Sequence, residues 1–274
     1  MAQGMTPQAR QLHDFLAASP GLALVEISEA KGSTPREVAT WMLVSPTGIF
    51  GTIGGGQLEF MAVARAREMI AQRIGTAKLD VPLGPEIGQC CGGRVTIDLA
   101  LVDDELRQTF PARIAVEEET QPNVFLFGGG HVGHALANAL SLLPLTTTLV
   151  ETRPEELEGV PEGIRTIGTA VPEEVVRDAR PDSAFVVLTH DHSLDFLIVA
   201  EALARGDAAY VGMIGSKTKK ATFRSWYLRE AGGTEERFSR LICPIGGTEV
   251  KDKRPAVIAA LVTAELLRYL PSRG

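Results

Sequence analysis

The 274-residue chain is 45% hydrophobic and 22% charged, which is typical of a folded protein with a sizeable core. Its 34 acidic residues outnumber its 27 basic ones, and the net charge of -7 argues against nucleic acid as a partner. No apolar stretch approaches about 18 residues, and no signal peptide is visible at the N-terminus. We therefore expect a cytoplasmic protein with no membrane association. Three cysteines, two of them adjacent, fit a reducing compartment rather than a disulfide framework.

The first half of the chain predicts a strand-rich unit. Apolar residues at Leu12, Phe15 and Leu16 lie on one face of a short helix. The turn-forming Ser45-Pro-Thr-Gly48 separates two apolar runs and so predicts a hairpin. The elements expected here are a helix ending near Ser19, strands at 22–30 and 94–102, a hairpin at 40–56 and an amphipathic helix at 57–75.

The second half alternates short β-branched runs with helical patterns, which is typical of βαβ units and a parallel sheet. An acidic, proline-containing stretch at 103–123 separates the halves. We predict an α/β protein with an N-terminal α+β domain at 1–118 and a Rossmann-like, doubly wound parallel-sheet domain at 119–274. Strands are expected at 123–127, 146–151, 163–168, 184–190 and 208–215, with helices after 131, at 173–179, at 194–206, from 217 and at 255–270.

A glycine-rich fingerprint opens the second half. Gly128, Gly130 and Gly133 follow a predicted strand and begin a helix, and Glu151 ends the next strand about 20 residues further on. Free N–H groups at such a helix N-terminus attract phosphate, and the acid would bond a ribose hydroxyl. The same glycines also serve merely to pack a helix against a strand, so a nucleotide in this half is one of two interpretations.

Other motifs in this half give weaker signals. His131 lies inside the glycine turn and would touch a ligand there, while Arg153 could take a phosphate in place of a ribose contact with Glu151. The segment 189–195, "THDHSLD", offers either a metal site or ordinary helix-cap chemistry at a strand end. The segment 213–220, "MIGSKTKK", fits either an anion site or a solvated basic face.

Cys90 and Cys91 lie in "GPEIGQCCGGRV". Adjacent cysteines do not readily form a disulfide and lack the C-x-x-C spacing of zinc sites. Burial is the ordinary fate of a free cysteine, but the flanking glycines leave the sulfurs approachable, and backbone N–H groups favour a thiolate that binds metals. The composition of this loop favours reactive thiols at Cys90 and Cys91.

Seven motifs in this order and spacing resemble the xanthine dehydrogenase accessory protein family, XdhC/CoxI. They are "GSTPRE", "GTIGGGQLE", "GQCCGGRV", "FGGGHVG", "LTHDHSLD", "VGMIGSK" and "ICPIGG", and they span about residues 30 to 250. The family pairs an N-terminal accessory domain with a C-terminal Rossmann-type domain. The chain departs from it in Glu151, where an aspartate is common, and in the residues after "CPIG".

The resemblance implies a cofactor chaperone rather than an enzyme. Its relatives bind the molybdenum cofactor, a molybdopterin, support its sulfuration with sulfur from a cysteine desulfurase, and deliver it to xanthine dehydrogenase. Carried over by position, Cys90 and Cys91 would face the metal, beside Gln89, and a helix N-terminus at "GGGQ" or "GGGH" would hold the pterin phosphate. The alternative is an NAD(P)-dependent oxidoreductase that uses the Rossmann-like half. A homo-oligomer is expected in either case.

Overall fold

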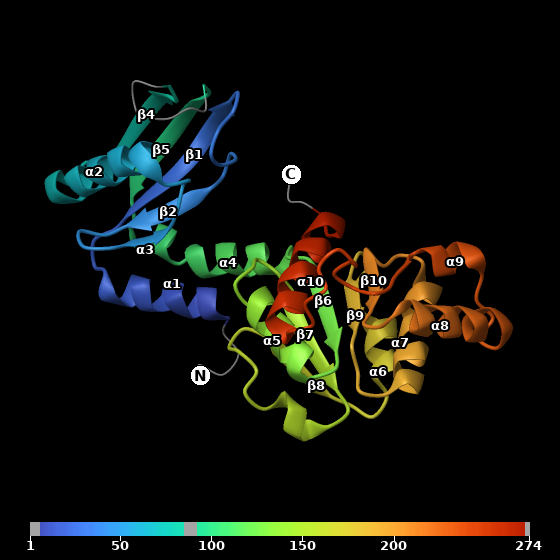
Figure 1. Ribbon diagram of the computed structural model, residues 1–274. Coiled ribbons are helices and arrows are strands. Elements are labelled where there is room, and N and C mark those ends of the chain that lie inside the picture. The colour runs from blue at the N-terminus through green and yellow to red at the C-terminus, as the bar shows by residue number, and fades with distance from the viewer. Residues whose placement is uncertain (1–5, 85–91, 272–274) are drawn as a thin grey trace. The chain divides into compact units, whose positions relative to one another are not determined.

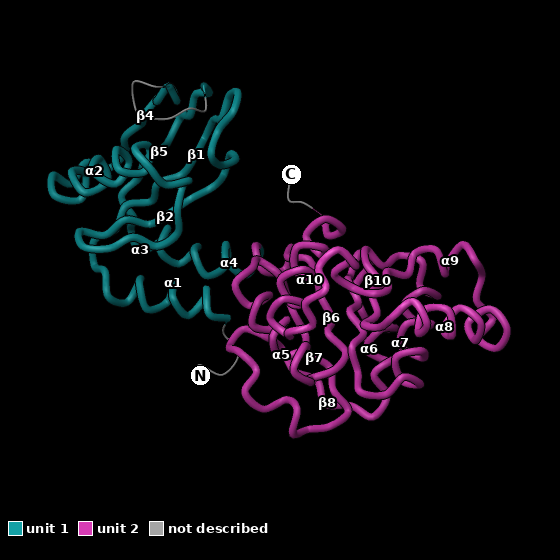
Figure 2. The backbone as a smooth tube through the Cα atoms, viewed as in Figure 1, with its two compact units in different colours: residues 1–116 teal, residues 117–274 magenta. Residues whose placement is uncertain are grey.

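The computed structural model describes residues 6–84 and 92–271. The chain divides into two compact units, residues 1–116 and 117–274 (Figure 2), and each is described by itself. The predicted domain boundary, between residues 118 and 119, lies two residues further along. Among the described residues, no helix is both long enough and apolar enough to cross a membrane.

Unit 1 is built around a five-stranded antiparallel sheet in the order β3-β2-β1-β5-β4 (Figure 1). Its elements are α1 (Pro7–Ala18), β1 (Ala23–Lys31), β2 (Trp41–Val44), β3 (Ile49–Gly51), α2 (Gly56–Gln72), β4 (Thr76–Pro82), β5 (Arg94–Leu101), α3 (Asp104–Arg107) and α4 (Phe110–Glu119). Alternate residues of β1 face opposite ways. Val25 therefore packs in the core with α2, while Leu24 joins a second apolar cluster with α1 and α4.

Unit 2 contains a six-stranded parallel sheet in the order β11-β10-β9-β6-β7-β8. Its elements are β6 (Asn123–Phe127), α5 (His131–Leu140), β7 (Thr146–Glu151), the 3-10 turn η2 (Pro154–Leu157), β8 (Arg165–Gly168), α6 (Pro172–Asp178), β9 (Ala184–Val187), α7 (His192–Arg205), β10 (Tyr210–Met213), α8 (Lys217–Arg229), α9 (Glu235–Ser239), β11 (Leu241–Ile242) and α10 (Pro255–Tyr269). The helices α5 and α10 pack on one face, and α6, α7 and α8 pack on the other.

The strand order of unit 2 fixes where a ligand would lie. The chain runs outward from β6 through β7 to β8, then returns to the other side of β6 and continues through β9 to β11. Such an order, with helices on both faces, is that of a doubly wound dinucleotide-binding sheet. Ligands of these sheets bind at the carboxyl ends of the strands where the order reverses, here between β6 and β9.

The predicted fold class is confirmed: an antiparallel sheet with helices precedes a Rossmann-like parallel sheet. The expected strands and helices of both halves are present, with ends shifted by a few residues. The elements that escaped prediction are β4, α3, α4, η2, α9 and β11. The edge strand β4 alternates exposed and half-buried positions over most of its length, so its apolar signal in the sequence is weak. The helix α4 lies inside the acidic stretch that we interpreted as a linker, and it forms there because its side chains Phe110 and Ile114 are buried.

The core of unit 2 gives a stability prediction. Phe185 is fully buried on β9, between Phe125 and Phe127, with ring centroids 5.7 and 6.4 Å away. We expect Phe185→Ala to lower the free energy of unfolding by about 3–5 kcal/mol, because it leaves a cavity. The half-exposed Leu197 of α7 provides a control whose alanine variant should cost no more than about 0.5 kcal/mol.

The chain has two tryptophans, Trp41 in unit 1 and Trp226 in unit 2. In a Trp41→Phe background, denaturant unfolding followed by tryptophan fluorescence therefore reports on unit 2 alone. Equal midpoints for Phe185→Ala and Leu197→Ala would show that β9 does not organise this core.

Candidate functional site

The turn between β6 and α5 has no room for a side chain at three of its glycines. A Cβ on Gly128, Gly129 or Gly133 would lie 2.4 Å from Leu188 O, 2.5 Å from Glu156 O and 2.0 Å from Gly128 O, respectively. These glycines are therefore needed by the fold. Gly130 differs, since its φ of -69° suits any residue and a Cβ there would meet nothing within 4 Å. The protein itself gives no reason for glycine at position 130, and the open space above it could accept a ligand.

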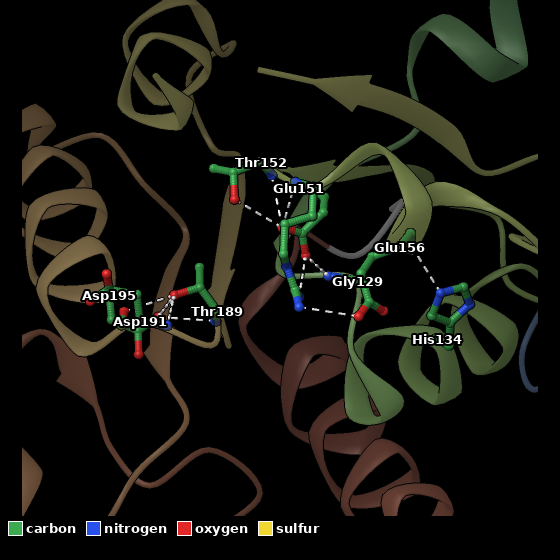
Figure 3. Close-up of polar contacts among 9 residues, drawn as sticks. Gly129, His134, Glu151, Thr152, Glu156, Thr189, Asp191 and Asp195 are labelled. Carbon is green, nitrogen blue, oxygen red and sulfur yellow. Dashed lines mark hydrogen bonds and ion pairs between the residues drawn. The ribbon is translucent and has the colours of Figure 1, made fainter. Parts of the chain in front are cut away.

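Gly130 is also the N-cap of α5, and no side chain caps that helix. A helix N-terminus carries unsatisfied N–H groups and a positive partial charge, which favour an anion such as a phosphate. His131, the first residue of the helix, is exposed beside this turn, whereas His134 packs its ring nitrogen Nε2 3.0 Å from the carbonyl oxygen of Glu156 (Figure 3). The structure thus places Gly128, Gly130, His131 and Gly133 together.

Glu151 joins the same turn from the end of β7. Its side chain is 2% exposed, and its Oε2 accepts a hydrogen bond from the N–H of Gly129 at 2.7 Å (Figure 3). Thr152 donates its N–H to Oε1 at 2.8 Å and its hydroxyl at 3.1 Å. Arg153 donates its own N–H at 3.0 Å and approaches with Nε at 3.3 Å and Nη2 at 3.2 Å. The carboxylate is therefore fixed at the position from which a ribose would be bound.

Burial by itself would raise the pKa of Glu151. The guanidinium of Arg153 and the N–H groups of Gly129, Arg153 and Thr152 outweigh burial and lower its pKa to about 2. Hydrogen bonds to the charged form favour that form. Glu151 is therefore an anion at all physiological pH values.

A second polar group lies at the carboxyl ends of β9 and β10. Asp195, in the first turn of α7, is fully buried and accepts hydrogen bonds from the N–H and the hydroxyl of Thr189, at 3.0 and 2.7 Å. Its other oxygen forms an ion pair with Lys219, whose side chain is 9% exposed. Removing one partner of such a buried pair leaves an uncompensated charge. The pair joins the first turn of α7 to the first turn of α8, and Thr189 ties the loop after β9 to the same carboxylate.

Of the two interpretations of the segment 189–195, a metal site or helix-cap chemistry, the structure shows the helix cap. Asp191 caps α7, with Oδ1 accepting the N–H of Ser193 at 2.7 Å, and His190 and His192 are exposed. No group of three or more His, Cys, Asp or Glu able to hold a metal occurs in the described part of the chain. Lys219 was expected on a solvated face or at an anion site, but it turns inward.

Sequence reasoning missed Asp195 as a structural centre of the site. The residue was visible as the last letter of "THDHSLD", but its burial becomes apparent only when Lys219 is known to reach it. A charged residue in the first turn of a helix is ordinary in itself, since acids there favour the helix dipole. The informative signal would have been an acid at a position where the helix faces the sheet.

In unit 1 the structure brings three of the sequence motifs together. A Cβ on Gly93 would lie 2.3 Å from Ser33 O, and one on Gly54 would lie 2.9 Å from the Cβ of Pro35. The "GSTPRE" loop therefore contacts both the glycine turn before α2 and Gly93, near the end of the "GQCCGG" motif. Gln89, Cys90 and Cys91 themselves lie outside the described residues.

Glu59 of α2 fixes the glycine turn that precedes this helix. Glu59, in the first turn, accepts hydrogen bonds at its Oε2 from the hydroxyl of Thr52 at 2.5 Å and from the N–H groups of Ile53 and Gly55 at 3.1 and 3.2 Å. Neither of the two helix N-termini predicted to hold a phosphate, at "GGGQ" and at "GGGH", is capped by a side chain. They differ in charge, because the first turn of α2 contains the acid Glu59 and the first turn of α5 contains no acid.

Cys243, at the end of β11, is half-buried and forms no disulfide. Burial raises the pKa of its thiol, although Lys220 and Lys219 oppose that change. The thiol is therefore protonated at neutral pH and is a poor metal ligand.

Two family models match the chain. One, the XdhC Rossmann domain, covers residues 124–266, more than half of the chain, and the other, the XdhC and CoxI family, covers residues 16–79. The chain belongs to the XdhC family. This confirms the resemblance inferred from the seven motifs, and the XdhC Rossmann domain coincides with the parallel sheet of unit 2.

Individual relatives of this XdhC chain are distant. The uncharacterized protein YqeB of Escherichia coli K12 is 26% identical over 256 residues, which is 90% of this chain but 43% of that protein. The chain therefore spans less than half the length of this relative. A crystal structure described as a xanthine dehydrogenase from Bacillus halodurans matches with a TM-score of 0.76 at 19% identity, over 97% of this chain and 96% of that one. At this identity the similarity shows the fold alone.

The ionised Glu151 should make stability depend on pH. Because its pKa falls from 4.5 to about 2 on folding, the carboxylate stabilises the fold by about 3 kcal/mol, fully above about pH 4.5. That contribution is lost as the pH falls toward about 2. We expect Glu151→Gln to be less stable at pH 7 and the difference from the wild type to shrink as the pH is lowered, measured by urea unfolding from pH 7 to pH 3. The exposed Glu155→Gln is the control, and a pH-independent difference would contradict the assignment.

The glycine turn gives a second prediction. Gly133→Ala should destabilise unit 2 strongly, because its Cβ would meet Gly128 O at 2.0 Å, whereas Gly130→Ala should fold with a melting temperature within a few degrees of the wild type. Thermal unfolding by circular dichroism compares the two. If Gly130→Ala unfolded as early as Gly133→Ala, position 130 would be required by the fold and not by a ligand.

Proposed function

We propose that this XdhC chain is an accessory protein that binds the molybdenum cofactor, supports its sulfuration and delivers it to xanthine dehydrogenase, without catalysing the dehydrogenase reaction. The observation that carries the proposal is membership in the XdhC family across both units, at 16–79 and 124–266. The partners in this proposal are xanthine dehydrogenase, a cysteine desulfurase as sulfur donor and a second copy of the chain. The compartment is the cytoplasm, where thiols stay reduced.

Unit 2 supports the phosphate-binding part of the proposal. The uncapped N-terminus of α5 and the open space at Gly130 fit a phosphate group of the ligand, while Gly128, Gly129 and Gly133 shape the turn. The acid Glu59 lies in the first turn of α2, whereas the first turn of α5 carries no acid, so α2 is the weaker candidate for a phosphate. In this proposal the absence of a side chain at Gly130 leaves room for the phosphate to reach the N–H groups at the start of α5, and His131 borders the ligand.

The metal-binding part of the proposal rests on the sequence. The cofactor, when bound, supplies a thiophilic molybdenum centre, and soft thiolates suit such a metal. Cys90 and Cys91, with Gln89 beside them, are the proposed contacts, because Cys243 is half-buried with a raised pKa. The described residues of unit 1 contribute the contact between the "GSTPRE" loop and Gly93.

A second candidate function is an NAD(P)-dependent oxidoreductase. The observation in its favour is the strand order of unit 2 together with Glu151 at the end of β7, the position that reads a ribose in dinucleotide-binding sheets. Against it, Asp195 is already tied to Lys219 and Thr189, so this buried acid is not free for proton transfer.

Metal and pterin content of the protein, purified anaerobically from a host that makes the cofactor, tests the main proposal. We expect molybdenum and pterin to accompany the wild type and Cys243→Ala, and the double variant Cys90→Ala/Cys91→Ala to lose at least nine-tenths of both. Cys243→Ala is the matched control, since it removes a thiol from unit 2.

Retention of the metal by the double variant would show that the two thiols are not its ligands. If neither the wild type nor any variant carried the cofactor, and reconstitution with free cofactor also failed, the oxidoreductase candidate would take precedence.

A further inference from the structure

Two acids and one base at and after the end of β7 lie beside the glycine turn. Arg153 Nη1 lies 3.2 Å from Glu156 Oε1, and its Nη2 lies 3.2 Å from Glu151 Oε2. Glu156 also borders the turn, because a Cβ on Gly129 would lie 3.1 Å from its Cβ. Two carboxylates therefore contact one guanidinium beside Gly129, and the group as a whole is negative.

The contacts of Arg153 with Glu151 are the longest that this carboxylate makes. Its side-chain nitrogens approach at 3.3 and 3.2 Å, while the N–H groups of Gly129 and Thr152 donate at 2.7 and 2.8 Å. Arg153 is also one-third exposed and keeps Glu156 as a partner if it leaves Glu151. The guanidinium is thus the partner that a ligand can displace most easily.

Two neighbouring hydroxyls of a ribose could replace the two guanidinium N–H groups on the same carboxylate. Each hydroxyl donates one hydrogen bond, so Glu151 would keep its backbone contacts and remain satisfied. A 2′-phosphate at the same place would bring between one and two further negative charges, about -1.5 to -2, next to Glu151 and Glu156. Arg153 cannot compensate for that charge, since both carboxylates already engage it.

We propose that unit 2 binds an adenine dinucleotide whose ribose carries free hydroxyls, with its phosphate over Gly130 and its ribose on Glu151, and that Arg153 and Glu156 make it reject the 2′-phosphorylated form. The inference rests on the phosphate-binding turn described for the proposed function, and it assigns that turn to the dinucleotide in place of the pterin phosphate. It adds the class of nucleotide and names the residues that determine specificity.

Titration calorimetry of the full chain with NADH and NADPH, at low ionic strength, tests the proposal. We expect NADH to bind at least tenfold more tightly than NADPH. Glu156→Gln should narrow this ratio severalfold by strengthening the binding of NADPH alone. The variant removes one negative charge near the 2′-phosphate and leaves Arg153 with one carboxylate partner fewer. Gly130→Ala, which is expected to fold, should weaken both nucleotides at least tenfold.

Arg153→Ala separates the proposal from its strongest rival, in which Arg153 itself receives the 2′-phosphate. The proposal expects the variant to bind NADH as tightly as the wild type or more tightly, since a competitor for Glu151 is gone. The rival expects tighter binding of NADPH by the wild type and a selective loss of NADPH in the variant.

Three results would overturn the inference: NADPH binding equal to or tighter than NADH binding, weaker NADH binding by Arg153→Ala, or no binding of either nucleotide at millimolar concentration. These affinities are measured without the molybdenum cofactor. Failure here therefore leaves the metal and pterin result intact, and failure of that experiment leaves the nucleotide preference standing.

Discussion

The hydrogen bond between the buried carboxylate of Glu151 and the N–H of Gly129 joins the end of β7 to the turn before α5. The bond requires an ionised acid in a place from which water is excluded, and burial alone would neutralise that acid. The N–H groups of Thr152 and Arg153 and the guanidinium of Arg153 supply the compensation. Every ligand-binding interpretation of unit 2 depends on this arrangement, because it sets the path of the turn over which a phosphate would lie.

Within that turn the demands of folding and of binding can be separated residue by residue. Gly128, Gly129 and Gly133 each lie against backbone oxygen atoms and leave no room for a side chain. Gly130 has room and an ordinary backbone conformation, so packing does not explain it. A glycine motif in the sequence does not distinguish these four positions. The structure shows that only Gly130 among them has no packing reason to be glycine, so a bound ligand is the remaining reason.

The sequence predicted the architecture well because periodicity and glycine spacing report on burial, which dominates both units. It predicted the place of Glu151 at the end of β7 as well, since strand ends follow from the same pattern. It could not predict that Lys219 turns inward to Asp195, because that pair depends on how α8 packs beside α7. Nor could it find α4, because its anchors Phe110 and Ile114 are buried in a cluster with residues distant in sequence, among them Leu24 and Leu43.

Charge is distributed around the turn in a way that would orient a ligand. At one end, the uncapped N-terminus of α5 attracts a single phosphate. At the other, the acids Glu151 and Glu156 flank Arg153 beside Gly129. Salt weakly screens the attraction or repulsion between charges that are closer together than the Debye length, which is about 8 Å at physiological salt. A ligand with a phosphate at one end and neutral hydroxyls at the other suits both parts of this charge distribution. A second phosphate beside the hydroxyls would be repelled by the carboxylates.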